Sequence, residues 1–309
     1  MSDIVVLQPI AETGITLLRD AGLDVYQART TTLEELAEPL ATARGAITRN
    51  FGFPATFIDA APNLRVIGVH GTGTDRIDRP AANARGIAIV NTPGTNARSV
   101  AEHTLSLMLA CARRLLPADA ATRAGHFEHR EQAGAVDLAG RTLGLVGFGE
   151  IGRRVAVLAR ALDMEVLVLS AHADPDALAG IGATRASGLE DLLTRSDVLS
   201  LHGVPGSIPV LDARLLGLLP RGAMVINTAR GAMIDEAALA EALQSGQLGG
   251  AGLDAFQTEP LPADSFLIDC PNLVLTPHIG GSSREALQRT SAEAARKVLA
   301  ALRTPTPVE

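Results

Sequence analysis

The chain has 309 residues, of which 47% are hydrophobic, enough for about two globular domains with buried cores. Thirty-four acidic against twenty-seven basic residues give a net charge of -7, and no basic stretch is interleaved with aromatic residues, so nucleic acid is not an expected partner. The N-terminus lacks the basic start and apolar run of a signal peptide, and no stretch approaches the roughly 18 apolar residues of a membrane span. We therefore expect a cytoplasmic protein that does not contact a membrane.

Two residue counts limit the chemistry further. Lys297 is the only lysine, so neither a Schiff-base mechanism nor a phosphate-binding lysine of the Walker type is supported. Cys111 and Cys270 are the only cysteines and lie far apart without metal-ligand spacing, which argues against a disulfide framework or a zinc site. We expect no metal, and arginine is the residue left to hold an anionic substrate.

Short apolar runs alternate with helical patterns over the first hundred residues. We expect a helix at about 12–21 and strands at 4–7, 46–48, 64–69 and 87–90. This alternation is typical of a parallel α/β sheet. A long helical pattern follows at about 98–116, with a buried stripe that includes Val100, Leu105 and Leu109, and we interpret it as a connector helix.

A second α/β series follows the connector. Its expected strands lie at 143–146, 165–169, 198–201, 224–226, 253–256 and 273–275. A final helix, at about 283–302, is expected to return to the first domain. We therefore predict one domain from residues 1–97 and 284–309, and another from residues 98–283.

The second series opens with a glycine-rich turn between a strand and a helix. The apolar run 142–146 leads into Gly147-x-Gly149-x-x-Gly152, and a helical pattern follows from Arg153. Gly147 permits a tight turn, Gly149 lets a phosphate approach the backbone, and Gly152 lets the helix pack closely on the strand. Because the helix amides would then face the anion, the pattern predicts a dinucleotide-binding domain.

Three strands of the second series are associated with unusual polar residues. Arg230 and His278 each follow an expected strand, Asp254 lies in one, and Glu259 comes shortly after it. Taken singly, Arg230 has an ordinary explanation as a surface arginine, Glu259 as a solvated acid and His278 as a structural histidine. In an open parallel sheet, however, ligands bind beyond the carboxyl ends of the strands, so these residues would share one edge with the glycine turn.

The three residue types suit a single reaction. Reduction of a 2-oxo acid needs a hydride donor, a cation that holds the carboxylate and an acid that protonates the carbonyl oxygen. Arg230 can form two parallel hydrogen bonds to a carboxylate, and His278 can exchange a proton near neutral pH. A carboxylate from Glu259 would orient the imidazole and favour its protonated form. A nicotinamide would carry the hydride.

Six motifs, in this order along the chain, resemble the D-isomer-specific 2-hydroxyacid dehydrogenase family, which includes phosphoglycerate dehydrogenases and hydroxypyruvate or glyoxylate reductases. They are VHGTGTDRID at 69–78, VNTPGTNARSVAE at 90–102, GFGEIG at 147–152, NTARG at 227–231, AGLDAFQTEP at 251–260 and TPH at 276–278. The resemblance covers nearly the whole chain. It implies two doubly wound parallel-sheet domains, a Rossmann cofactor domain and a flavodoxin-like substrate domain, in a homodimer.

The resemblance also implies roles for single residues. Arg230 would bind the substrate carboxylate, Glu259 would pair with the acid/base, and His278 would donate or accept the proton. The segment Gly71, Thr72 and Gly73 would lie beside the substrate and the nicotinamide. Arg49 matches a substrate-loop position, although a solvated arginine explains it equally well.

The expected cofactor contacts are spread along the second series. The resemblance places Glu150 and Ile151 on the pyrophosphate and Asp254 on the carboxamide. The full expected set is Thr72, Gly147, Gly149, Glu150, Ile151, Gly152, Ser170, His172, Gly203, Thr228, Ala229, Asp254 and Gly280.

Two departures from the family pattern bear on the cofactor. NAD-selective members have an Asp at the end of the second strand of the cofactor domain, and Ser170 stands there. Because no acid repels a 2′-phosphate, Ser170 with His172 slightly favours NADP, although no arginine immediately follows. The loop after the strand 198–201 looks shorter than usual, which leaves the contact of Gly203 open, and His202 is interpreted as structural.

Three functions follow from these observations. The leading hypothesis is an NAD(P)-dependent oxidoreductase that interconverts a small 2-oxo acid and its D-2-hydroxy acid, with hydroxypyruvate or glyoxylate as the expected 2-oxo acid. The first alternative is a 3-phosphoglycerate dehydrogenase without a regulatory domain, although phosphate recognition needs further cations and the sequence does not place Arg76 or Arg79 near the substrate. The second is a dinucleotide-sensing binding protein similar to the corepressors that resemble this family, because a fold alone does not fix a function.

Overall fold

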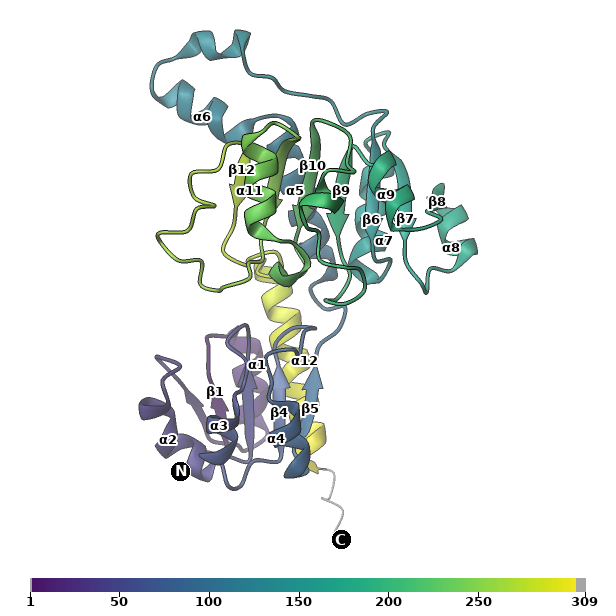
Figure 1. The fold of residues 1–309 in the computed structure, drawn as a ribbon. Helices are drawn as coiled ribbons and strands as arrows, with labels where there is room; N and C mark the ends of the chain where they lie inside the picture. Colours follow the sequence, from purple (N-terminus) through teal and green to yellow (C-terminus); the bar gives the residue numbers. More distant parts are fainter. Residues whose placement is uncertain (1, 304–309) are drawn as a thin grey trace. The chain divides into compact units, whose positions relative to one another are not determined.

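The computed structural model describes residues 2–303 and contains two compact units, each built around its own parallel sheet (Figure 1). Unit 1 comprises Met1–Asn96 and Gly281–Glu309, and unit 2 comprises Ala97–Gly280. The predicted boundaries, after residues 97 and 283, lie one and three residues later, and the part of the prediction from Thr304 onward lies outside the described residues. The expected fold class, two parallel-sheet α/β domains, is confirmed.

Unit 1 contains a five-stranded sheet in the order β2-β1-β3-β4-β5, which is the order of flavodoxin-like domains. Its strands are β1 Ile4–Val6, β2 Val25–Gln27, β3 Gly45–Thr48, β4 Val66–Val69 and β5 Ala88–Asn91. Its helices are α1 Glu12–Asp20, α2 Leu33–Thr42, α3 Ala55–Asp59, α4 Arg79–Ala84 and α12 Arg284–Arg303.

Alternation along β1 explains how helices cover both faces of this sheet. Ile4 and Val6 belong to the apolar cluster that includes α1 and α12, whereas Val5 belongs to the cluster that includes α2 and α3. Gly14 permits α1 and α12 to approach closely, because a Cβ atom there would lie 2.7 Å from the carbonyl oxygen of Ser291. The final helix therefore packs on the first sheet, and its long-range return completes unit 1.

Unit 2 contains a seven-stranded sheet in the order β12-β11-β10-β9-β6-β7-β8. Its strands are β6 Thr142–Val146, β7 Glu165–Leu169, β8 Ala183–Arg185, β9 Val198–Leu201, β10 Ala223–Asn227, β11 Leu248–Leu253 and β12 Leu273–Leu275. Its α-helices are α5 Ala97–Ala112, α6 Leu115–Arg123, α7 Glu150–Arg160, α8 Pro175–Gly180, α9 Leu189–Arg195, α10 Ala213–Leu216 and α11 Glu236–Gln244; two 3-10 helices are η1 Phe127–Glu131 and η2 Gly231–Met233. Strand order reverses between β6 and β9, as in a Rossmann sheet.

The strand expected at 253–256 is wrong in position. The structure has β11 at Leu248–Leu253, so Asp254 lies just beyond the strand rather than within it. The strand contains three glycines, so its sequence does not show the apolar pattern by which a buried strand is predicted. Gly252 is needed for packing, since a Cβ atom there would lie 2.9 Å from the Cβ of Leu107 on α5. The absence of side chains lets the helix lie against the sheet.

The connector helix expected at 98–116 is also wrong, because it is two helices. α5 ends at Ala112, Arg114 has a φ of 50°, and α6 begins at Leu115. Neither α6 nor η1 has a buried residue, and Figure 1 shows this segment extending away from the rest of unit 2. We call residues 115–131 the arm.

Four further observations concern features that the composition argued against. Within residues 2–303, no helix combines the length and apolar character needed to cross a membrane, and no group of three His, Cys, Asp or Glu side chains is arranged to hold a metal ion. Cys111 and Cys270 are buried free thiols. Lys297 has a structural contact, because its Nζ donates to the Asn91 carbonyl oxygen at 2.7 Å.

Candidate active site

The carboxyl ends of the strands in unit 2 share one edge of the sheet, because all pairs are parallel. Most of the residues expected to bind cofactor or to act in catalysis lie in the loops at this edge. The glycine turn follows β6, Ser170 follows β7, Gly203 follows β9, the segment 228–230 follows β10, Asp254 follows β11, and the loop 276–280 follows β12. This edge is the candidate site of unit 2.

The glycine turn fits a pyrophosphate group. Gly147 has a φ of 94°, and a Cβ atom there would lie 2.8 Å from the carbonyl group of His202. A Cβ atom on Gly152 would collide with the carbonyl oxygen of Gly147, whereas one on Gly149 would meet nothing within 4 Å. The outer glycines are therefore fixed by packing, and the middle one leaves open space in front of the N-terminus of α7.

The two residues at the start of α7 differ in burial. Glu150 is exposed in the first turn, and Ile151 packs against the apolar core of unit 2. Since an apolar side chain and a carboxylate do not attract an anion, the main-chain amides are what this turn offers a phosphate.

The position expected to select the cofactor lies in the loop after β7. Ser170 is half-buried and His172 is exposed. Arg185, which the sequence analysis did not single out, donates from Nη2 to the carbonyl oxygens of Ala173 at 2.6 Å and Ser170 at 3.3 Å. It was missed because β8, with one buried residue, was not predicted.

The loop after β9 folds back on itself. A Cβ atom on Gly203 would contact the hydroxyl group of Ser207, so the glycine is part of a tight loop. The Nε2 of His202 lies 2.9 Å from the Oγ of Ser200, and burial lowers the pKa of His202 to about 4. His202 is therefore neutral and packed at the strand end, as a structural residue would be.

The Arg230 segment is held by a buried amide. Asn227 donates from Nδ2 to the Arg230 carbonyl oxygen at 2.8 Å, and its Oδ1 accepts from the Ala229 amide at 3.0 Å. The hydroxyl groups of Thr228 and Thr104 lie 2.9 Å apart, and Arg230 donates from Nη1 to the Ala229 carbonyl oxygen at 2.8 Å. The loop is thus fixed from both the sheet and α5.

Glu259 and His278 form a pair, although 19 residues separate them. Both carboxylate oxygens of Glu259 lie 3.0 Å from the Nδ1 of His278, and the side chains are 11% and 29% exposed, respectively. The amide of Phe256 donates to the Oε1 of Glu259 at 3.1 Å, which fixes the carboxylate. With Nδ1 donating to Glu259, Nε2 is the ring nitrogen left to exchange a proton with a ligand.

His278 has a φ of 54°, a left-handed conformation that is uncommon outside glycine. Such conformations persist where the surroundings hold them, and they are concentrated at functional sites. Here the holding group is Asp254, which is 2% exposed. Its carboxylate accepts hydrogen bonds from Thr276 Oγ1 at 2.7 Å, Ile279 N at 2.8 Å and Gly280 N at 2.8 Å, and lies 3.3 Å from His103 Nε2.

These contacts decide the charge of Asp254. Burial raises its pKa, but the hydrogen bonds from His103, Thr276 and two main-chain amides outweigh burial, so its pKa lies below the ordinary value. The ionised carboxylate therefore anchors the residues on both sides of His278. Contact of Asp254 with a carboxamide stays a prediction, as do the cofactor roles of Thr228, Ala229 and Gly280.

In unit 1, the expected substrate loop is fixed by the next strand. The Gly71 amide donates to the Oγ1 of Thr92 at 2.9 Å, and the Thr92 amide donates to the Gly71 carbonyl oxygen at 2.9 Å. Asn91 donates from Nδ2 to the Thr72 carbonyl oxygen at 2.7 Å. Thr72 itself is exposed and Gly73 is half-buried, so a rigid stretch of main chain faces solvent.

Arg49 is half-buried rather than solvated. It donates from Nη1 to the Pro9 carbonyl oxygen at 2.9 Å and from Nη2 to Ser282 Oγ at 3.5 Å, and burial lowers its pKa. Close by, burial and the positive charge of Arg49 lower the pKa of His70 to about 4, and its Nε2 lies 2.9 Å from Ser291 Oγ. Arg49 is thus a fixed cation beside an uncharged imidazole.

Two further arginines lie near this loop of unit 1. Arg76 donates from Nη1 to the carbonyl oxygen of Asn50, next to Arg49 in the chain, at 2.8 Å. Arg79 donates from Nη2 to Thr74 Oγ1 at 2.7 Å. The structure therefore places Arg76 beside the segment that carries Arg49, which the sequence left open.

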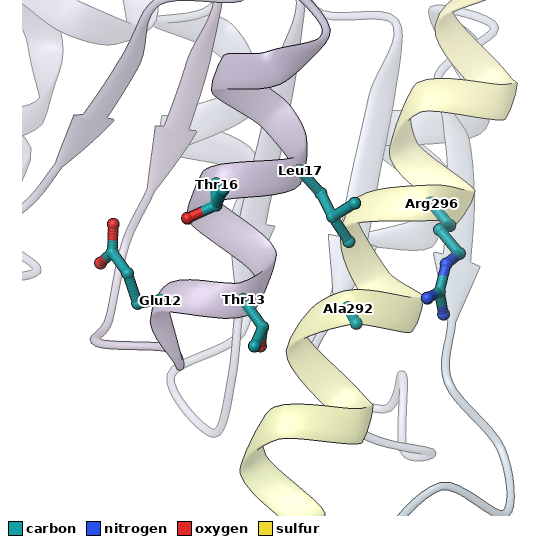
Figure 2. Close-up of a pocket in the computed structure, with 6 residues that line it drawn as sticks. All are labelled: Glu12, Thr13, Thr16, Leu17, Ala292 and Arg296. Atoms are coloured by element: carbon teal, nitrogen blue, oxygen red, sulfur yellow. The ribbon is translucent and has the colours of Figure 1, made fainter.

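A groove in unit 1 lies between α1 and α12 and has a volume of about 490 Å³ (Figure 2). Figure 2 shows Leu17 pointing toward α12, and Arg296 lies 3.6 Å from Glu293. The lining residues are Glu12, Thr13, Thr16, Leu17, Ala292 and Arg296. None of them was expected to bind substrate or cofactor.

The chain is similar to known proteins in sequence and in fold. Residues 105–280 match the family model described as "D-isomer specific 2-hydroxyacid dehydrogenase, NAD binding domain". Curated D-3-phosphoglycerate dehydrogenases from Archaeoglobus fulgidus and Mycobacterium leprae are 37% identical over 287 residues and 39% identical over 250 residues. The alignments cover 92% and 80% of this chain but 54% and 47% of those proteins, so the chain spans about half the length of the curated relatives it matches.

Two solved structures match this chain over nearly their whole length. The TT0316 protein from Thermus thermophilus has a TM-score of 0.89 and 37% identity, with 98% of each chain covered. An NADPH-dependent glyoxylate/hydroxypyruvate reductase from Sinorhizobium meliloti has a TM-score of 0.85 and 28% identity, with 100% of this chain and 98% of that chain covered.

Proposed function

The chain belongs to the D-isomer-specific 2-hydroxyacid dehydrogenase family, and from this premise we propose that it interconverts a small 2-oxo acid and its D-2-hydroxy acid with NAD(P). The observation that carries the proposal is the pair of Glu259 and His278, with a carboxylate 3.0 Å from Nδ1 at the carboxyl edge of the sheet that also bears the glycine turn. Arg230 follows a neighbouring strand at that edge.

The chemistry of each residue follows from its contacts. A bound nicotinamide supplies or accepts the hydride. In reduction, His278 gives the proton from Nε2 to the carbonyl oxygen of the substrate, and in oxidation it takes the proton back. Glu259 accepts from Nδ1, keeps the ring in this orientation and stabilises the protonated imidazole. Arg230 holds the substrate carboxylate with parallel hydrogen bonds.

Unit 1 supplies recognition in this proposal. The main chain of Gly71, Thr72 and Gly73 offers amides to the substrate, and Thr92 holds this loop in place. Arg49 adds a positive charge that is fixed by Pro9. Preorganised groups of this kind bind small anions well, because little side-chain entropy is lost on binding.

For the cofactor, we propose NADP(H) in preference to NAD(H). The proposal is supported by the open space around Gly149, which leaves the main chain accessible to a pyrophosphate, and by Ser170, which leaves no acid to repel a 2′-phosphate. A relative that is NADPH-dependent by name, at 28% identity, supports the same choice.

For the substrate, we propose hydroxypyruvate or glyoxylate, the compounds named for the Sinorhizobium meliloti reductase. A second candidate is the phosphorylated 2-oxo acid of a D-3-phosphoglycerate dehydrogenase. It is supported by the curated relatives of that name and by Arg76, a second cation, which donates to the carbonyl oxygen of Asn50, the residue after Arg49. A phosphate group needs such additional cations.

A substrate panel tests both candidates. The chain is mixed with NADPH or NADH and with glyoxylate, hydroxypyruvate, pyruvate or 3-phosphohydroxypyruvate, and loss of the reduced nicotinamide is followed. We expect the highest kcat/KM for hydroxypyruvate or glyoxylate with NADPH. If 3-phosphohydroxypyruvate is preferred and Arg76→Gln raises KM for it alone, the second candidate is correct. Nucleotide binding without turnover of any acid supports a sensing protein and rejects both.

We also propose a homodimer in which a second copy covers the arm. Three large apolar side chains of the arm are exposed to solvent: Leu115 is 58% exposed, Leu116 47% and Phe127 67%. Several exposed apolar side chains on one segment are typical of a protein–protein interface, whereas single ones are common on any surface. A cytoplasmic location without nucleic-acid or membrane partners stays a prediction of the sequence.

Molar mass in solution tests the dimer. Light scattering after size-exclusion chromatography should give twice the chain mass for the wild type and one chain mass for Phe127→Asp. Val157→Asp is the matched control, because Val157 is 52% exposed in unit 2 but lies on α7. A monomeric wild type, or a Phe127→Asp variant that stays dimeric, contradicts the arm as an interface.

A further inference from the structure

Arg185 lies at the end of the edge strand beside the cofactor-selecting position. β7 and β8 are parallel, and Arg185 is in register with Val168, two residues before Ser170. Arg185 is therefore at the carboxyl edge of the sheet, on the outer side of the loop that starts at Ser170. The sequence alone does not indicate that Arg185 lies close to Ser170, because the two residues are fifteen positions apart.

The loop holds Arg185 by one nitrogen. Its Nη2 donates to the carbonyl oxygens of Ala173 at 2.6 Å and Ser170 at 3.3 Å. A guanidinium has five N–H donors, and no acidic partner of Arg185 lies among residues 2–303. The side chain is exposed, so the remaining donors face solvent while the loop carbonyls fix its position.

The charges around this loop favour an anion at its start. Ser170 replaces the acid of NAD-selective relatives, and His172 is exposed two residues later. Asp174 is the nearest acid in the loop, but its Oδ1 accepts the Asp176 amide at 3.2 Å and caps α8. Arg185 is thus the fixed full positive charge at the Ser170 end of the loop.

We propose that Arg185 is the residue that selects NADP(H), by binding the 2′-phosphate of the adenosine ribose that Ser170 admits. The inference rests on the proposed cofactor site and deepens it. A phosphate monoester carries a charge of about -1.5 to -2 near neutral pH, and a guanidinium matches its oxygens with paired hydrogen bonds. Because the loop carbonyls already order the side chain, less entropy is lost on binding than for a free arginine.

Nucleotide binding without substrate tests this inference. Titration calorimetry is run with NADPH, NADH, 2′,5′-ADP and 5′-AMP on the wild type, Arg185→Met and Arg185→Lys. We expect the wild type to bind NADPH and 2′,5′-ADP more tightly than NADH and 5′-AMP. Arg185→Met should weaken NADPH and 2′,5′-ADP about tenfold, the effect of roughly one charge-assisted hydrogen bond, and change NADH by less than about twofold.

Three variants test whether the effect is specific to the charge and the hydrogen bonds of Arg185. Arg195→Met is the matched control, because Arg195 is an exposed arginine of unit 2 that pairs with Asp191 at 3.1 Å, away from the loop. It should leave all four affinities unchanged. Arg185→Lys should retain part of the preference, since it keeps the charge but loses the paired donors. Ser170→Asp should reverse the preference toward NADH, because a carboxylate repels the phosphate and pairs with Arg185.

The outcomes separate this inference from the proposed activity. Equal weakening of NADPH and NADH by Arg185→Met shows that Arg185 only shapes the loop and overturns the inference. A wild type that binds NADH more tightly than NADPH also overturns it. If Arg185→Met weakens NADPH alone while no 2-oxo acid is reduced, the inference stands and the proposed activity fails. Failure to bind any of the four nucleotides rejects both.

Discussion

Unit 1 and unit 2 both present loops beyond the carboxyl ends of parallel strands, but they offer different chemical groups there. Unit 2 presents a hydrogen-bonded pair, Glu259 and His278, supported by the buried carboxylate of Asp254. Unit 1 presents main-chain groups at Gly71 to Gly73 and one half-buried arginine, Arg49, while its histidine at the strand end, His70, is buried and uncharged at neutral pH.

The supports of the two loops differ as well. In unit 1, Thr92 on the following segment fixes Gly71 directly. In unit 2, one face of α5 reaches three separate loops: Ser99 donates to Gly280, His103 contacts Thr276, and Thr104 contacts Thr228. A site that moves protons needs ionisable groups held accurately, whereas a site that binds an anion needs only fixed donors. This difference supports our proposal that unit 2 transfers the proton and that unit 1 recognises the substrate.

The largest expected effect is loss of the imidazole in unit 2. His278→Ala should lower kcat about 10²–10⁴-fold, the usual contribution of a general acid, while NADPH affinity stays within about twofold of the wild type. Steady-state kinetics with hydroxypyruvate and calorimetry with NADPH measure the two quantities. Glu259→Gln, which keeps an acceptor for Nδ1 but removes the charge, should give a smaller loss of kcat. If His278→Ala has the same kcat as the wild type, the proposal that unit 2 transfers the proton is wrong.

The next largest effects are expected for Arg230 in unit 2 and Arg49 in unit 1, and they should fall on different kinetic constants. Arg230→Gln should lower kcat/KM about 10–150-fold, as expected for about 1.5–3 kcal/mol from a hydrogen bond to a charged group. Arg49→Gln should raise KM with little change in kcat, because recognition without proton transfer acts on the ground state and the transition state alike. The two variants are assayed with the same substrate. A larger loss of kcat in Arg49→Gln than in Arg230→Gln contradicts the division of labour.

Acid should destabilise both units through their buried histidines. The pKa values of His70 in unit 1 and His202 in unit 2 are lowered to about 4, so the unfolded chain binds a proton at higher pH than the folded chain. Stability is then complete above the ordinary imidazole value of about 6.5 and falls as the pH decreases toward about 4. For His70, which is 7% exposed, the slope is about 1.4 kcal/mol per pH unit in this range.

Calorimetric unfolding at pH 7, 6 and 5 measures this slope. His70→Gln should reduce the acid sensitivity of the wild type, because the remaining decrease then comes from other groups such as His202. A Tm that is independent of pH in the wild type, or an unchanged slope in His70→Gln, contradicts the buried neutral imidazole in unit 1.

The smallest expected effect is in the glycine turn, where one substitution should change NADPH affinity and another should change the stability of the fold. Gly149→Ala adds a methyl group in open space, so Tm should stay constant while NADPH affinity decreases about tenfold by steric conflict with the pyrophosphate. Gly152→Ala is the contrasting variant, because its methyl group collides with the Gly147 carbonyl oxygen and should lower Tm. If Gly149→Ala binds NADPH as the wild type does, the turn does not hold the phosphates.

The sequence predicts the strand ends of unit 2 well, because their signals are local. A run such as 224–226 followed by Arg230, or 273–275 followed by His278, reveals both the strand and the polar residue beyond it. The strand β11 was misplaced because its glycines serve the packing of α5, a contact with a helix more than a hundred residues earlier. Local pattern cannot report a packing partner that is remote in sequence.

The same limit explains the residues that were missed. Arg185, His103 and Ser99 act on loops in which they do not lie, and only the pairing of strands and the placement of α5 bring them there. The short edge strands β2 and β8 were missed because each has a single buried residue, too few for an alternating pattern. A histidine or arginine on an expected helix or short strand gives no sign of the loop it contacts.

The most direct test of the central claim is the stereochemistry of turnover. The wild-type chain is given NADP or NAD with either D-glycerate or L-glycerate, and formation of the reduced nicotinamide is followed alongside His278→Ala. The account predicts that the D-enantiomer is oxidised, that the L-enantiomer is not, and that His278→Ala abolishes most of the rate. Oxidation of L-glycerate, or of D-glycerate at an equal rate by His278→Ala, would contradict it.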